Sequence, residues 1–112
     1  MGYVYIVSNK HRTVFYTGVT NDIERRAGEH KAGVGSIFTS KFKCNVLLYF
    51  EQYMTMGEAI EREKLLKRWK REWKLDLIKT DNPDMFDLAA DWFDQEQLDA
   101  IIAEYKNRRQ EP

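Results

Sequence analysis

Hydrophobic and polar positions near the N-terminus follow the pattern of two β-strands. Residues 3–8 place successive side chains on opposite faces, and residues 13–18 are rich in β-branched and aromatic types. We expect the second strand to return antiparallel to the first and to form a hairpin. If a four-residue loop spans residues 9–12, Tyr5 lies opposite Tyr16, within cross-strand contact.

The hydrophobic period changes to that of a helix after the second strand. Asn21 or Asp22 is a candidate N-cap for this helix, and Gly33 is a candidate stop signal. Arg26 and His30 both lie within it. Their spacing stacks two side chains on one helical face, so we expect them to point the same way.

Three further elements complete the pattern. The apolar run at 46–50 predicts a buried third strand. Residues 57–79 form the strongest helical stretch, as one helix or as two helices broken near Lys70, and Asn82-Pro83 ends it because proline disfavours helical backbone at the preceding residue. A last amphipathic helix begins at Asp94. We therefore expect an α+β fold, with a small three-stranded antiparallel sheet flanked by helices.

Length and charge refine this organisation. The chain has 112 residues and no net charge, but residues 1–80 hold 15 Lys and Arg against 9 Asp and Glu, whereas residues 81–112 hold 3 against 9. We predict a core domain at 1–80 and an acidic C-terminal extension at 81–112, whose amphipathic helix packs on the same domain. A basic surface is typical of nucleic-acid binding, although solvated helical faces account for such charge runs equally well.

Membrane insertion and disulfide bonding are not expected. No apolar stretch approaches the roughly 18 residues that span a bilayer, and the N-terminus lacks the pattern of a signal peptide. Cys44 is the single cysteine, so an intrachain disulfide is excluded. We expect a cytoplasmic protein with no membrane partner.

Several side chains are of the types that phosphodiester hydrolysis needs, namely a base for water and positive charge near the phosphate oxygens. Tyr5 or Tyr16 could act as the base if a nearby cation lowered its pKa, which is ordinarily near 10. Arg26 presents a planar guanidinium that matches phosphate. His30 could orient a tyrosine or assist proton transfer.

The long helical stretch adds a carboxylate for a divalent metal. Glu61 and Glu63 both lie there, and periodicity does not choose between them. One carboxylate is sufficient for Mg²⁺, because this ion keeps several waters and takes other ligands from substrate phosphate. The basic residues of 64–74 could follow a phosphate backbone. In the structural alternative, Trp69 and Trp73 face the core and the basic residues face water.

The two tyrosine motifs resemble those of the GIY-YIG nuclease superfamily, in particular its small single-domain bacterial proteins. Tyr3-Val4-Tyr5 stands where the family has Gly-Ile-Tyr, and Tyr16-Thr17-Gly18 stands where it has Tyr-Ile-Gly. The distance from the second tyrosine to the family's catalytic arginine selects Arg26 over Arg25. His30 falls at a position where the family has His or Tyr.

The same resemblance implies a metal site and a reaction. Ala59-Ile60-Glu61-Arg62-Glu63-Lys64 resembles the family's metal-binding segment in a register that selects Glu63. By resemblance, Mg²⁺ or Mn²⁺ on Glu63 stabilises the leaving oxygen, Arg26 binds the scissile phosphate, and a tyrosine activates water, with Tyr5 favoured over Tyr16. The implied function is a metal-dependent endonuclease that hydrolyses DNA, with structure-selective repair or recombination among its roles. The alternative is a nucleic-acid-binding module without appreciable turnover, since both tyrosine motifs depart from the family pattern.

Overall fold

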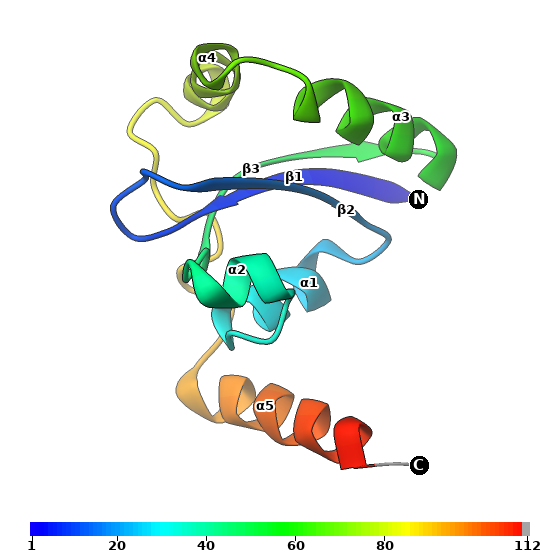
Figure 1. Cartoon of the computed structure of the whole chain (residues 1–112), viewed down its shortest axis with the longest axis vertical. Coiled ribbons are helices and arrows are strands. Elements are labelled where there is room, and N and C mark those ends of the chain that lie inside the picture. The colour runs from blue at the N-terminus through cyan, green and yellow to red at the C-terminus, as the bar shows by residue number, and fades with distance from the viewer. Residues whose placement is uncertain (111–112) are drawn as a thin grey trace.

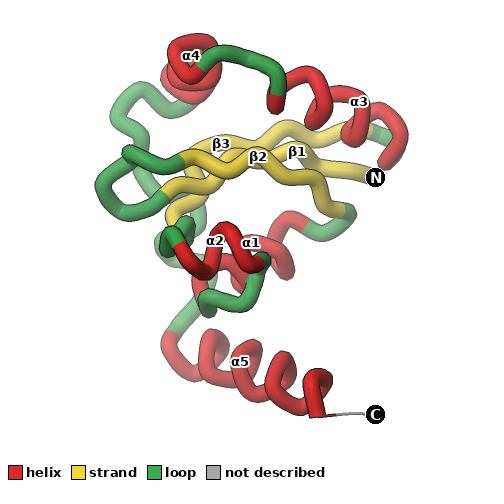
Figure 2. Tube along the Cα trace, in the orientation of Figure 1, coloured by secondary structure: helices red, strands yellow, loops and turns green. Residues whose placement is uncertain are grey.

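The computed structural model describes residues 1–110 and places one small sheet between two helical layers (Figures 1 and 2). The sheet is antiparallel, with the first strand in its centre. Its strands are β1 (Gly2–Ser8), β2 (Phe15–Thr20) and β3 (Val46–Tyr53). The helices are α1 (Ile23–Lys31), α2 (Ile37–Lys41), α3 (Met56–Lys67), α4 (Arg71–Asp81) and α5 (Gln95–Gln110). The predicted α+β class and three-stranded sheet are confirmed.

Strand β1 is buried on both of its faces, which explains its nearly continuous run of apolar residues. Val4 and Ile6 point to the side of the sheet that α3 and α4 cover. Tyr5 and Val7 point to the opposite side, where α1 packs through Ala27. The alternating side chains of β1 thus contribute to the core on both sides of the sheet.

The predicted register of the hairpin is wrong. Tyr5 pairs with Gly18 rather than Tyr16, and Tyr16 pairs with Val7. The cause lies in the turn, where the side-chain oxygen of Asn9 accepts the backbone N–H groups of residues 13 and 14 at 2.9 and 3.1 Å. These N–H groups are withheld from the ladder, so pairing begins later, at Phe15. Because side chains alternate along a strand, Tyr16 still shares the face of Tyr5.

The first helix begins and ends as predicted, but a short helix that follows was not predicted. Asp22 caps α1 by accepting the N–H of Arg25 at 3.1 Å, and Gly33 follows the helix with a φ of 79°. Ser36 caps α2 in the same way, through the N–H of Thr39. A helix of one turn carries no measurable hydrophobic period, so the sequence held no signal for α2.

The long helical stretch forms two helices, which was one of the two alternatives predicted from the sequence. The break falls between Lys67 and Arg71. Trp69 packs against the core beside Leu66, whereas Trp73 is half exposed with the Lys70 ammonium over its ring. The two tryptophans therefore divide between the core and the surface.

Helix α5 of the acidic extension packs on α1 and lies away from α4. Asp94 and Gln97 form a reciprocal cap at the start of α5. Helix α5 approaches α1 so closely that a Cβ on Gly28 would lie 2.9 Å from Ile101 Cδ1. Figure 1 shows α5 and α4 at opposite ends of the molecule. Within residues 1–110, no helix has the length and apolar character needed to cross a membrane.

Candidate active site

Three of the predicted site residues are in direct contact at the interface of β1 and α1. The Tyr5 hydroxyl lies 2.9 Å from His30 Nε2 and accepts a hydrogen bond from Arg26 Nε at 3.2 Å. Tyr5 is 1% exposed and His30 is 3% exposed, whereas the Arg26 side chain keeps 24% of its surface. Because Arg26 and His30 lie four residues apart on α1, their side chains point the same way and both contact the buried Tyr5 hydroxyl.

The glycine of the second tyrosine motif makes room for this contact. Gly18 pairs with Tyr5 across the hairpin. A Cβ at position 18 would lie 2.4 Å from both Tyr5 Cζ and the Tyr5 hydroxyl oxygen, which is far inside van der Waals contact. The tyrosine ring therefore lies flat over the backbone of β2, and no other residue type fits there without displacement.

His30 continues the hydrogen-bond chain to α2. Its Nδ1 lies 3.0 Å from the Thr39 hydroxyl, and a Cβ on Gly35 would lie 2.2 Å from that nitrogen. Burial, followed by the nearby Arg26 charge, lowers the His30 pKa to about 4, so the imidazole is neutral at pH 7. The assignment that satisfies each group has Tyr5 donating to Nε2 and Nδ1–H donating to Thr39.

Tyr5 is held as a neutral phenol. Burial raises its pKa to about 12 and outweighs the lowering by the Arg26 charge and hydrogen bond. A phenol with such a pKa and 1% exposure is a hydrogen-bond anchor for Arg26 and His30.

Tyr16 lies at the edge of this cluster and is partly exposed. Its ring centroid is 6.0 Å from that of His30, in an edge-to-face arrangement, and 5.8 Å from that of Phe38 of α2, in a stacked one. On its other side, Lys67 Nζ lies 6.0 Å from the Tyr16 ring centroid. Tyr16 therefore stands between the α1 cluster and α3.

Glu63 lies on α3 and is linked to Tyr16 through that lysine. The Lys67 ammonium is 3.4 Å from Glu63 Oε1, and the Glu63 side chain is only 15% exposed. Glu61 is 78% exposed and pairs with the exposed ammonium of Lys64, on the solvent side of the helix. The structure thus separates two carboxylates that periodicity left equivalent.

An ion pair beside Glu63 fixes the rotation of α3. Arg62 donates from Nε and one Nη to the two oxygens of Glu51 on β3, at 2.9 and 3.0 Å. The hydroxyl of Tyr53 also donates to Glu51, at 2.8 Å. With Arg62 anchored to the sheet, the next residue, Glu63, is held on a neighbouring face of the helix.

For a metal ion, Glu63 offers a single carboxylate. In the part of the chain that the structure describes, no three His, Cys, Asp or Glu side chains are grouped so as to hold a metal ion. Mg²⁺ and Mn²⁺ can bind through one carboxylate when water and substrate phosphate complete the shell. The Lys67 ammonium pairs with this carboxylate, so a metal ion bound there would compete with Lys67.

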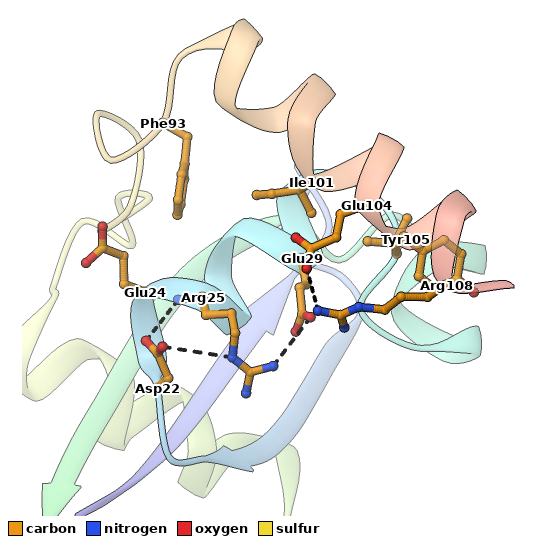
Figure 3. Close-up of a pocket in the computed structure, with 10 residues that line it drawn as sticks. Asp22, Glu24, Arg25, Glu29, Phe93, Ile101, Glu104, Tyr105 and Arg108 are labelled. Carbon is orange, nitrogen blue, oxygen red and sulfur yellow. Dashed lines mark hydrogen bonds and ion pairs between the residues drawn. The ribbon is translucent and has the colours of Figure 1, made fainter. Parts of the chain in front are cut away.

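A separate cavity of about 340 Å³ lies between α1 and α5 (Figure 3). Its rim carries the ion pairs of Arg25 with Glu29 and of Arg108 with Glu104, and Phe93 and Ile101 line its apolar side. None of the predicted site residues lines it. The cavity is therefore distinct from the Tyr5 cluster, which lies between α1 and the sheet.

Comparison with known proteins matches this arrangement to a family. A family model described as the GIY-YIG catalytic domain matches residues 1–76. The chain belongs to the GIY-YIG family. A UPF0213 protein of Staphylococcus haemolyticus is 39% identical over 77 residues, which cover 69% of this chain and 93% of that protein. UPF0213 proteins of Haloquadratum walsbyi and Clostridium perfringens are 41% and 39% identical, over 69% and 71% of this chain and 85% of each relative. No solved structure matches.

The GIY-YIG motifs account for part of the site. Glu29 and Thr39 were not predicted beside it, and Lys67 was expected only as one of the basic residues of 64–74 that could follow a phosphate backbone. Glu29 accepts from an Arg26 Nη at 3.1 Å, and Lys67 pairs with Glu63. Their helical spacings from Arg26 and Glu63 were signals that could have found them. Thr39 had no such signal, because only the tertiary fold brings α2 to His30.

The buried imidazole of this GIY-YIG cluster predicts a pH-dependent stability. The His30 pKa is lowered from 6.5 to about 4 on folding, so the unfolded chain takes up a proton first as the pH falls. We expect the free energy of unfolding to fall progressively from pH 6.5 to 4, by about 3 kcal/mol in all. Urea unfolding at several pH values measures this.

The second histidine of the chain supplies the control. His11 is exposed, so His11→Gln should keep the pH dependence of the parent, whereas His30→Gln should flatten it even if its stability at pH 7 is lower. Equal pH dependence in all three proteins would show that His30 takes up its proton in the folded state as readily as in the unfolded chain.

Proposed function

We propose that the protein is a divalent-metal-dependent endonuclease that hydrolyses DNA phosphodiester bonds. The observation that carries the proposal is the contact of Arg26 and His30 with the hydroxyl of Tyr5, inside a GIY-YIG domain and beside Tyr16. GIY-YIG is a nuclease family, and these are the residue types that bind phosphate and handle protons.

Arg26 is the phosphate-binding group in this proposal. Its Nε is occupied by Tyr5 and one Nη by Glu29, so the guanidinium is held in one orientation while part of it remains exposed. A cation fixed in this way stabilises charge that develops on the phosphoryl oxygens without reorganising during the reaction. Tyr5 and Glu29 act as its positioning residues.

Tyr16 is the group that activates water. The pKa of Tyr5 is about 12, so it stays a neutral phenol at pH 7, and its hydroxyl is engaged by two partners; no basic oxygen is therefore available there. Tyr16 is partly exposed and therefore accessible to water, and Lys67 Nζ lies 6.0 Å from its ring centroid. To act as the base, Tyr16 first gives up its own phenolic proton to solvent. The water oxygen then attacks phosphorus, the Tyr16 phenolate takes the proton of that water, and the opposite P–O bond breaks, with the leaving oxygen taking up a proton from solvent.

Glu63 would hold the Mg²⁺ or Mn²⁺ ion. Bound there, the ion supplies positive charge near the leaving oxygen. Lys67 neutralises the carboxylate in the absence of metal, which allows Glu63 to remain 15% exposed without a large desolvation cost.

A cleavage assay tests the proposal directly. The purified protein is incubated with single-stranded, duplex and branched DNA in Mg²⁺ or Mn²⁺, and in EDTA. We expect cleavage with metal and none with EDTA. Binding of DNA without cleavage of any substrate in either metal would contradict the proposal and support a nucleic-acid-binding module instead.

Replacing each tyrosine by phenylalanine separates their roles. Tyr16→Phe should lower the single-turnover rate by about 100-fold or more, the usual contribution of a general base, with little change in stability. Tyr5→Phe should also lower the rate, but with a loss of about 1–3 kcal/mol in unfolding free energy, because Arg26 and His30 lose their partner. If Tyr16→Phe were fully active and Tyr5→Phe inactive at unchanged stability, Tyr5 would be the base.

A further inference from the structure

An exposed apolar patch lies on α2, directly beside the candidate active site. Ile37 is 91% exposed, and Phe38 and Phe42 are each 41% exposed. We call these three side chains the α2 platform. Large apolar groups gathered on one short surface helix are unusual unless the surface binds something.

The platform continues the aromatic edge of the active site. Phe38 stacks on Tyr16 with centroids 5.8 Å apart and an interplanar angle of 28°. The ring centroid of Phe42 lies 4.7 Å from that of Phe38. Tyr16, Phe38 and Phe42 therefore form a continuous row of three rings that begins at the proposed water-activating tyrosine.

Hydrogen bonds hold α2 rigidly against the catalytic cluster. The Thr39 hydroxyl contacts His30 Nδ1 at 3.0 Å and Ser36 Oγ at 2.9 Å. The Thr39 carbonyl accepts the N–H of Cys44 at 2.9 Å. Thr39 is 2% exposed, so the platform is fixed in place before any ligand arrives.

The charge around the platform matches a polyanion. The Lys41 ammonium lies 5.5 Å from the Phe42 ring centroid, and Lys67 lies on the far side of Tyr16. Residues 30–50 contain lysines and no Asp or Glu. Aromatic rings interleaved with lysines are the composition with which proteins bind single strands, because bases stack on the rings while cations neutralise phosphates.

We propose that the α2 platform stacks the unpaired bases next to the scissile phosphate, so that single-stranded or locally unpaired DNA is the preferred substrate. This inference rests on the proposed nuclease function for its biological meaning. A paired base presents no free face to Phe38 or Phe42, because its neighbours in the duplex cover both sides. Phe38 and Phe42 thus select substrate through stacking, and Lys41 contributes sequence-independent attraction.

Binding measurements on an inactive protein test the inference separately from cleavage. In a Glu63→Gln background with EDTA, the affinity for a fluorescent single strand and for its duplex is measured by anisotropy. Phe38→Ala/Phe42→Ala should weaken single-strand binding by at least about tenfold and duplex binding by less than about threefold. A protein that never cleaves DNA would still give this result, so failure of the nuclease proposal is distinguishable.

Matched variants test whether a loss of affinity comes from the loss of stacking on Phe38 and Phe42. Phe86 is a 66% exposed phenylalanine that makes no ring contact with the platform among the described residues, and Phe86→Ala should bind like the parent. Phe42→Trp keeps a stacking surface and should retain single-strand affinity. Lys41→Ala should weaken single-strand and duplex binding alike.

Three outcomes would overturn the inference. The first is unchanged single-strand affinity in the double variant when circular dichroism shows it folded. The second is an equal loss for duplex and single strand, which would assign the platform to general DNA contact. The third is a parent protein that sediments as a dimer while Phe42→Ala sediments as a monomer, which would make the patch a contact between two copies.

Discussion

Glu63→Gln is expected to cleave DNA at least about 1,000-fold more slowly than the parent in Mg²⁺. Glutamine keeps the size of the side chain but lacks the charge that holds a divalent ion, and among the described residues no group of three or more His, Cys, Asp or Glu side chains could hold the ion instead. Loss of a metal's charge stabilisation removes several kcal/mol from the transition state, and each 1.36 kcal/mol is a factor of ten in rate. Single-turnover cleavage rates measure the effect.

Glu61→Gln is the matched control for this substitution. It removes the same charge from the same helix at a position that is 78% exposed, so cleavage should be within about twofold of the parent. Glu63→Gln should remain folded, since its pair with half-exposed Lys67 is worth at most about 1 kcal/mol. Equal cleavage rates in the two variants would remove Glu63 from the proposed site.

Gly18→Ala is expected to destabilise the protein by about 3 kcal/mol or more. The new Cβ would lie 2.4 Å from Tyr5 Cζ and from the Tyr5 hydroxyl oxygen. Tyr5 cannot move away, because it is 1% exposed and bound to Arg26 and His30. Overpacking of this kind strains both strands and displaces the anchor of the site. Denaturant unfolding gives the change, and activity should fall with it.

Two further variants show that the effect is a steric contact with Tyr5. Gly57→Ala adds a methyl group on exposed α3 with its nearest neighbour at 3.9 Å, and it should be neutral or stabilising by up to about 1 kcal/mol. In Tyr5→Leu/Gly18→Ala the smaller side chain relieves the clash, so the two losses should be less than additive. Strict additivity would place the strain elsewhere.

The hairpin shows how much of the fold the alternation of side chains along a strand predicts. Alternation predicted both strands and placed Tyr5 and Tyr16 on one face, and both features are present. The register was wrong because it depended on the side chain of Asn9, which removes two backbone N–H groups from the ladder. Periodicity reports which face a residue occupies, whereas pairing depends on turn hydrogen bonds that it does not encode.

The candidate site was likewise predicted only in part from the sequence. Helical spacing alone placed Arg26 and His30 together, and resemblance to the GIY-YIG family selected Glu63 over Glu61. Sequence reasoning favoured Tyr5 as the base, but its burial raises its pKa to about 12, and this leads us to propose Tyr16 instead. Desolvation arises from every element that packs around a group, so one strand's sequence cannot report it.

The sequence by itself determined the α+β class, the faces of the strands, the cap of α5, a choice of two caps for α1, and the residue types of the proposed phosphate-handling site. These depend on local periods and on hydrogen bonds between near neighbours. Only the tertiary structure decided the contact of Gly18 with Tyr5, the junction of His30 with Thr39, and the exposed rings of α2 beside Tyr16. Each joins elements distant along the chain, and its geometry follows from how they pack rather than from any one segment's pattern.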